Sequence, residues 1–319
     1  MPGCHIMSRN WIWGLGISIL VMLSIVVFDS KPVTEQDTRL GEFMLQGLRD
    51  DLAGVHKMVF KNSEMITTLE SRDGNWVVLE RFGFDADFGK LAGLLKAITG
   101  SRLTERKTSK PKNFSILGVA SNDPDAVEIE IFSKQSSYTV LVGNSVSNRT
   151  GQYIRLLKHE TEANQVWLID TELESSADPA YWLDDAVIDV EAERVQRVMF
   201  SQGEVVLVAE RKDGELELQG LAEGAELRYP TIVNTLARAL VNVRLIDLVP
   251  AGQVDFSSAS KAQFSLDDES EINLVVVETQ GSYWLNLLDH AHSEWAFEVD
   301  SLVFENLTKQ PEDLLKQAD

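Results

Sequence analysis

Two histidines at alternate positions are the residues best suited to bind a metal. His290 and His292 lie in the segment DHAH, and Glu294 follows at the same spacing. On a strand all three side chains would point to one face, because successive side chains alternate between the two faces. Imidazole and carboxylate groups are ordinary zinc ligands. We favour a loop between two strands for this segment, because the first half of the chain has no matching pair, so no metal ligand is assigned.

Two adjacent carboxylates, Asp184 and Asp185 in WLDD, are the candidates for acid–base chemistry. Adjacent side chains point to opposite faces of a strand and diverge by about 100° on a helix. This pair is therefore poorly placed to act as a general acid and base. The preceding Tyr181 and Trp182 are expected to pack at a domain junction, and an interaction surface is the alternative.

The sequence has none of the common catalytic motifs. It contains no glycine-rich phosphate loop, no G-x-S-x-G elbow and no H-E-x-x-H pair. We therefore assign no catalytic and no cofactor-binding residue, and we expect the protein not to be an enzyme.

A basic run stands out against an acidic background. Between positions 102 and 112 a single acid, Glu105, accompanies five basic residues: Arg102, Arg106, Lys107, Lys110 and Lys112. Such a run could contact a lipid headgroup, an anionic polymer or an acidic partner, or it could be a solvated loop. The whole chain carries a formal net charge of -21, from 50 acidic and 29 basic residues. A phosphate backbone would be repelled, so we expect no nucleic-acid partner.

One apolar segment predicts a membrane anchor. Residues 11–28, WIWGLGISILVMLSIVVF, contain no charged side chain and would span roughly 27 Å as a helix, close to the thickness of a bilayer core. The residues taken to form the anchor are Trp11, Trp13, Leu15, Ile19, Leu23 and Phe28. The flanking charges favour a cytoplasmic N-terminus and an exported remainder, in a single-pass protein of a bacterial inner membrane facing the periplasm. A cleaved signal peptide is the alternative.

The chain repeats itself at a nearly constant interval. VHKMVF at residues 55–60 returns as VQRVMF at residues 195–200. At the same offset of 140, Asp73-Gly74 matches Asp213-Gly214, and after a slip of two residues Arg102-Leu103 matches Arg244-Leu245. Constant offsets with one slip are typical of a diverged tandem repeat. We therefore predict two copies of one domain.

Each copy has the pattern of a hairpin followed by a helix. Asp-Gly between β-rich runs predicts a tight turn, because the turn requires positive φ. Residues 85–100 predict a helix with Phe88, Leu91, Leu94, Leu95 and Ile98 on one face, and residues 229–245 predict its counterpart. Hairpin-linked strands without β-α-β alternation indicate antiparallel sheets and an α+β class.

These observations divide the chain into six segments. They are a cytoplasmic N-terminus (1–10), a transmembrane anchor (11–28), a polar stalk with a short helix (29–50), a first α+β repeat (51–182), a second α+β repeat (183–309) and a C-terminal tail (310–319).

Several blocks resemble one family. DPAYWLDDAVIDVEAERVQRVMF, ADFGKLAGLLKAI, KTSKPKNFSILGV, YPTIVNTLARAL and LTKQPEDLLKQ occur in the order seen in the bacterial domain-of-unknown-function 4340 family. The resemblance implies a membrane-anchored periplasmic protein that associates with the permease and auxiliary subunits of an ABC-2 type, gliding-motility-like transporter. It supplies no catalytic residues. The alternative function is a periplasmic module that binds an envelope polymer or lipid in the cleft between the two repeats.

Overall fold

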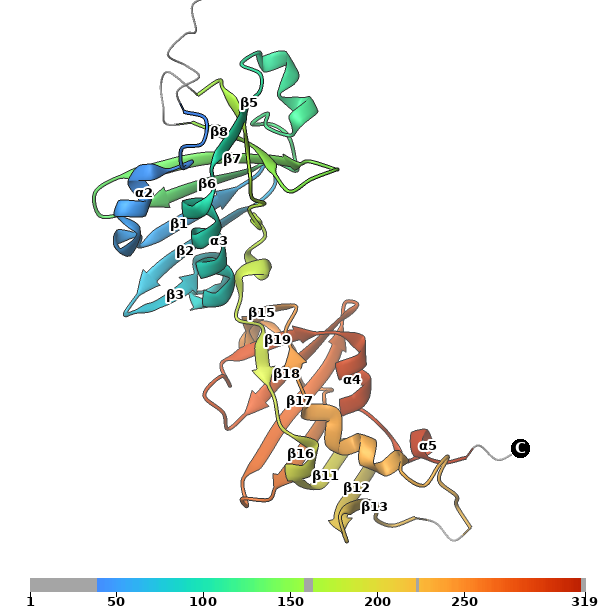
Figure 1. Cartoon of the computed structure of the whole chain (residues 1–319). Coiled ribbons are helices and arrows are strands. Elements are labelled where there is room, and N and C mark those ends of the chain that lie inside the picture. Colours follow the sequence, from blue (N-terminus) through green and yellow to red (C-terminus); the bar gives the residue numbers. More distant parts are fainter. Residues whose placement is uncertain (1–38, 158–162, 222–223, 317–319) are drawn as a thin grey trace, which may run out of the picture.

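The computed structural model describes residues 39–157, 163–221 and 224–316. These residues form two lobes that follow each other along the chain, an N-terminal lobe (39–182) and a C-terminal lobe (183–316), each built on one antiparallel sheet (Figure 1). The predicted anchor at 11–28 lies outside the described residues. Within the described residues, no helix combines the length and the apolar sequence needed to cross a bilayer.

The sheet of the N-terminal lobe has nine strands. In spatial order they are β4 (Phe84–Asp85), β3 (Asn75–Val78), β2 (Ile66–Arg72), β1 (Lys57–Lys61), β6 (Val127–Phe132), β7 (Ser137–Ser145), β8 (Gln152–Leu156), β9 (Val166–Ile169) and β5 (Leu103–Arg106). The helices of this lobe are α2 (Gln46–Asp50), α3 (Phe88–Gly100) and the short 3₁₀ turns η2 (Leu52–Gly54), η3 (Leu79–Arg81), η4 (Pro111–Asn113), η5 (Ser115–Leu117) and η6 (Pro179–Trp182).

The sheet of the C-terminal lobe has eight strands. In spatial order they are β13 (Glu215–Leu218), β12 (Val205–Lys212), β11 (Val195–Gln202), β16 (Ser260–Leu266), β17 (Glu271–Thr279), β18 (Ser282–Leu288), β19 (Trp295–Val299) and β15 (Asp247–Pro250). The remaining elements are the ribbon β10 (Ala186–Ile188) with β14 (Val243–Arg244), the helices α4 (Ser301–Leu307) and α5 (Pro311–Leu314), and the 3₁₀ helices η7 (Ala192–Arg194), η8 (Ile232–Leu240) and η9 (Ala251–Gln253). The fold is thus mostly antiparallel sheet with few helices, which confirms the α+β-like class at this coarse level.

Apart from β4, the two sheets have the same strand order. In each sheet three consecutive strands, β1 to β3 or β11 to β13, lie toward one edge, and the opposite edge is closed by β5 or β15. In the C-terminal lobe the short strand β14 stands between η8 and β15 and pairs with β10 outside the sheet. The cross-strand partners agree as well, because Lys57 faces Glu70 in one lobe and Arg197 faces Glu210 in the other.

Both predicted Asp-Gly turns are present. Asp73 and Gly74 join β2 to β3 with φ of 51° and 95°, and Asp213 and Gly214 join β12 to β13 with φ of 49° and 92°. Positive φ at both central residues is the feature of the tight hairpin turn that Asp-Gly favours.

Helix α3 ends where the sequence predicts but begins three residues later, because Asp85 belongs to β4, and it agrees only partly with its predicted face. Asp87 caps it, because its carboxylate accepts a hydrogen bond from the Lys90 N–H at 3.0 Å. Leu91, Leu94 and Ile98 are buried against the sheet. Phe88 was expected on the same face but is 65% exposed, because it is the first residue of the helix and precedes the turns that cross the sheet.

The helix predicted over residues 229–245 is shorter and more tightly wound than expected. Over Ile232–Leu240 the backbone forms a 3₁₀ helix, η8, whose N–H groups bond three residues back, as from Asn234 to Thr231. The Asn234 side chain accepts a hydrogen bond from the Leu216 N–H of β13 at 2.7 Å, which holds the first turn against the sheet edge.

The chain preceding β1 is part of the N-terminal lobe. Residues 29–50 were assigned to a polar stalk, and α2 is the short helix expected there. However, Met44, Leu45 and Leu48 are buried in the main hydrophobic core. The C-terminal residues are also attached, because Leu314 is buried and its carbonyl accepts a hydrogen bond from the Arg228 N–H at 2.9 Å.

Candidate functional site

The basic run begins at an arginine stacked on an aromatic ring. The Arg102 guanidinium lies 3.8 Å from the centroid of the Phe43 ring, and the Arg49 guanidinium lies 3.6 Å from the same centroid. Arg102 also donates a hydrogen bond to the Gly41 carbonyl at 2.6 Å. This arginine therefore fastens the segment before α2 to the start of β5.

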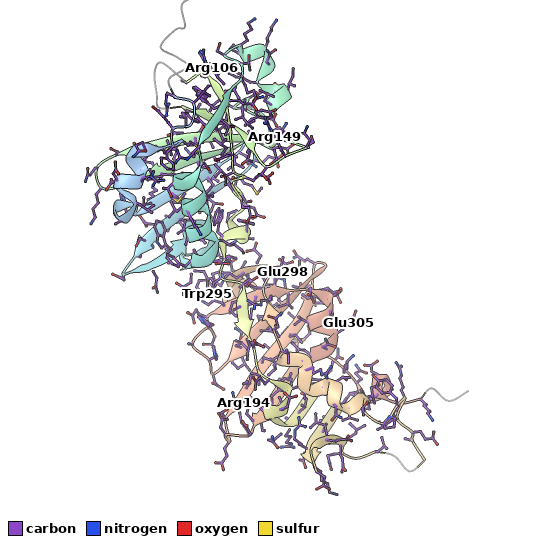
Figure 2. The ribbon with its side chains drawn as sticks, in the orientation of Figure 1. Arg106, Arg149, Arg194, Trp295, Glu298 and Glu305 are labelled. Carbon is purple, nitrogen blue, oxygen red and sulfur yellow. The ribbon has the colours of Figure 1, made fainter. Side chains whose placement is uncertain are left out.

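The middle of the run is engaged in a local charge network. Lys107 donates to the Glu105 carboxylate at 2.5 Å, and Arg149 pairs with the other oxygen of that carboxylate. These bonds, that from Lys107 first, lower the pKa of Glu105. Arg106 donates from Nε to the Gln165 side chain at 2.8 Å. Figure 2 shows Arg106 and Arg149 in the part of the N-terminal lobe that lies away from the other lobe.

Lys110 and Lys112 lie beyond the end of β5, in and beside η4, and both are exposed. Since β5 alone spans roughly 13 Å, the five basic residues extend along an edge of the lobe instead of meeting at one point. The run is therefore an extended edge whose first three members already have partners within the lobe.

Trp182 is a core residue. It is fully buried and stacks on Phe60 with ring centroids 4.4 Å apart, and its indole N–H donates to the Ser176 carbonyl at 2.9 Å. Trp182 therefore cannot be part of an interaction surface. It packs inside the junction, as the sequence predicts. Tyr181 is half-buried, and burial, followed by Glu174 and Asp87, raises the pKa of its hydroxyl.

The candidate catalytic and metal-binding residues do not converge. His290 and Glu294 lie in the loop between β18 and β19, with His292 between them, so the strand needed to align them is absent there. Within the described part of the chain, no three His, Cys, Asp or Glu side chains could hold a metal ion. Asp184 and Asp185 diverge, because the Asp185 carboxylate binds Arg244 at 2.8 Å while Asp184 does not.

The two lobes meet in a joint formed by side chains that the sequence did not single out. Arg81 of η3 binds the Asp247 carboxylate of β15 through two nitrogens, at 2.5 and 2.7 Å. Both side chains are about three-quarters buried, and the bond to Asp247 raises the pKa of Arg81. A two-point bond between fork-shaped groups fixes orientation as well as distance.

Aromatic rings form a second set of contacts between the lobes. Phe84 of β4 meets Trp295 of β19 edge to face at 5.6 Å and Phe297 at 6.2 Å, and its ring lies 6.0 Å from that of His292. Figure 2 shows Trp295 and Glu298 at the end of the C-terminal lobe that faces the other lobe. The sequence offers one sign of this joint, the apolar segment FGF at residues 82–84. Three residues are too few to show whether they belong to a helix or a strand, or what they contact.

A hollow of about 380 Å³ lies beside the connection between the lobes. We call it the acidic–aromatic hollow; its lining residues are Gly74, Asn75, Trp76, Asp85, Ala86, Phe88 and Asp184. Its walls carry two aromatic side chains and two carboxylates. The basic run, which we considered as a contact for a ligand between the repeats, contributes nothing to it.

The comparisons with known proteins identify one family. Residues 76–269, which reach from the N-terminal lobe far into the C-terminal lobe, match the family described as "Domain of unknown function (DUF4340)". No curated protein and no solved structure matches the chain. Because the match covers well over half of the 319 residues, the chain belongs to the DUF4340 family.

Proposed function

We propose that the protein is a non-catalytic, membrane-anchored accessory subunit of an ABC-2 type transporter complex, with both lobes in the periplasm. The apolar run at 11–28 supports the anchor, and the family resemblance supports the partner. The observation that carries the proposal is the joint between the lobes. Arg81, Asp247 and the rings of Phe84 and Trp295 hold two sheets as one body, which can keep partners at a fixed spacing.

We also infer that the two lobes are tandem copies of one domain. Three independent features support this: the shared strand order, the paired Asp-Gly turns, and the equivalent cross-strand partners at an offset of 140. An experimental structure should let residues 55–78 superpose on 195–218 with the two turns coincident. Lobes that coincide in strand order but not in register would argue against duplication.

The experiment is a pull-down of the tagged full-length chain from membranes dissolved in mild detergent, with mass spectrometry of the recovered proteins. We expect an ABC permease and its ATPase. A chain beginning at residue 30 serves as control, because it separates contacts made by the lobes from contacts made by the anchor. Recovery of the full-length chain without a transporter component, even after chemical cross-linking, would contradict the proposal.

The alternative function, a module that binds an envelope polymer or lipid between the repeats, stays a prediction. Its original contact, the basic run, lies away from the acidic–aromatic hollow, so any ligand held there must meet carboxylates and aromatic rings.

A further inference from the structure

Two aromatic residues that are not fully buried line the acidic–aromatic hollow, and one of them, Trp76, also packs against the main hydrophobic core. Phe88 is 65% exposed at the start of α3, and Trp76 is half-buried on β3. Exposed aromatic side chains inside a concave site are typical of surfaces that bind a ligand or partner. The hollow therefore offers ring faces to whatever enters it.

The backbone that carries these groups is fixed before any ligand arrives. The Trp76 carbonyl accepts a hydrogen bond from the Ala86 N–H at 2.8 Å, and the Asp85 carbonyl accepts one from the Asp184 N–H at 3.0 Å. Ala86 also pairs with Leu183 across the connection between the lobes. Elements from both lobes thus hold the walls in place, which lowers the ordering cost of binding.

The two carboxylates of the hollow are not compensated. Neither Asp85 nor Asp184 forms an ion pair with a cation in the described ranges, whereas the neighbouring Asp87 and Asp185 bind Lys90 at 3.6 Å and Arg244 at 2.8 Å. The partial positive charge at the start of α3 is offset by its cap, Asp87. On a chain with a net charge of -21, the hollow therefore carries two negative charges that are not balanced by an ion pair.

A cationic side chain can interact favourably with both the aromatic rings and the carboxylates of the hollow. Ring faces attract a cation electrostatically, and the effect grows when the cation is partly desolvated. Carboxylates add direct charge pairing and steer a basic partner toward the site. An anionic ligand would be repelled, and a neutral sugar would leave both carboxylate charges without a counter-ion.

We propose that the acidic–aromatic hollow receives a lysine or arginine side chain from a basic segment of a partner protein. This inference rests on the proposed function as an interaction subunit and names the chemistry of one contact. The ring faces of Trp76 and Phe88 hold the cation, and Asp85 and Asp184 neutralise it.

The test uses the full-length protein in detergent and fluorescein-labelled tetra-arginine, with binding followed by fluorescence anisotropy. We expect saturable binding that weakens as salt rises. Asp85→Asn with Asp184→Asn should weaken binding at least ten-fold, and Phe88→Ala at least three-fold. The matched controls are Asp125→Asn with Asp289→Asn, two exposed aspartates that form no ion pair with the described residues, and Ile116→Ala, an exposed apolar residue in η5. These controls should leave the affinity unchanged.

Two results would overturn the inference. If the hollow variants and their controls weaken binding equally, the peptide senses only the overall charge. If neutral chitotetraose displaces the peptide and binds the Asp85→Asn, Asp184→Asn protein normally, the hollow is a sugar site.

The same double variant in the pull-down separates this inference from the proposed function. A transporter recovered as well by the variant as by the unchanged chain contradicts the hollow contact alone. Peptide binding at the hollow without recovery of any transporter component contradicts the transporter proposal alone.

Discussion

At the scale of single residues, the exposed fraction of a side chain decides whether it can contact a partner protein or only packs inside the fold. Tyr181 and Trp182 are neighbours of similar chemistry, yet Trp182 is fully buried on Phe60 while Tyr181 remains half-exposed beside Lys90. Sequence could identify both as junction residues. Which of the two faces inward depends on the direction of η6, and that direction is set by tertiary contacts.

Replacing Trp182 tests its structural role. Trp182→Ala removes a fully buried ring and leaves a cavity beside Phe60, so we expect the free energy of unfolding to fall by about 3–5 kcal/mol. Urea unfolding followed by circular dichroism measures this. Tyr181→Ala is the matched control and should lose clearly less. If both variants lost the same free energy of unfolding, burial of Trp182 against Phe60 would not be a major source of stability.

Glu128 of β6 provides a prediction of pH dependence. Burial, the largest cause, raises the pKa of its carboxyl above the ordinary value of 4.5. A carboxyl with a raised pKa in the folded state favours folding only while it is protonated, and this contribution is lost as pH rises through the folded-state value. Glu128→Gln should therefore stabilise the protein at pH 7 and give no gain near pH 4. Unfolding curves at both values measure the difference; a gain that is independent of pH would count against burial as the cause.

At the scale of elements, local chemistry explains the turns and α3 but not η8. Asp-Gly determines its turn within two residues, and Asp87 determines where α3 begins. The first turn of η8 also bonds to β13, because Asn234 accepts a hydrogen bond from Leu216, which lies 18 residues earlier in the chain. The same pattern of apolar residues is compatible with an α-helix and with a 3₁₀ helix, so the sequence pattern alone did not distinguish them at η8.

Helix α3 contains glycines that can be tested directly. Gly93 is exposed in the middle of the helix, and an added Cβ would meet no atom within 4 Å. Gly93→Ala should therefore raise the free energy of unfolding by about 0.5–1 kcal/mol, because glycine loses more backbone entropy on folding.

The matched control is Gly143→Ala. At Gly143 a Cβ would lie 2.5 Å from Val119 Cγ1 and 2.6 Å from the Leu117 carbonyl, so this variant should be destabilised. Thermal unfolding of both proteins provides the comparison. If Gly93→Ala lowered the free energy of unfolding, the prediction would be wrong, and the added methyl group would have to meet another part of the protein.

At the scale of the whole molecule, the joint decides whether the lobes act as one body. The contacts come from η3 and β4 on one side and β15 and β19 on the other, elements more than 160 residues apart. The main hydrophobic core includes residues of both lobes. The family match also runs across the boundary between the lobes.

Weakening the joint should loosen the lobes without unfolding them. We expect Arg81→Ala with Trp295→Ala to broaden the distribution of distances between spin labels placed on α3 and α4, measured by double electron–electron resonance after replacement of Cys4. Circular dichroism should remain unchanged. The control is Arg194→Ala, which removes an exposed ion pair to Asp267 and Asp268 far from the joint. If the distances in the joint variant were distributed as narrowly as in the unchanged protein, the contacts of the joint would not be what holds the lobes together.

The sequence by itself determined the features that depend on nearby residues. These are the antiparallel α+β-like class, both Asp-Gly turns, the presence of α3 and its C-terminal end, and membership of the family. Each follows from local backbone preference or from residue order, so no distant partner is needed.

Only the tertiary structure decided which residues meet across the lobes. The Arg81–Asp247 pair and the rings around Phe84 bring together residues from distant strands, and Asp184 joins the hollow formed by residues 74–88. Such contacts leave no periodic signal, because each depends on the register of two sheets and on the angle at which they join. The same dependence on tertiary contacts exposed Phe88, which the helical pattern had placed on the buried face of α3, whereas Trp182 is buried at the junction as expected.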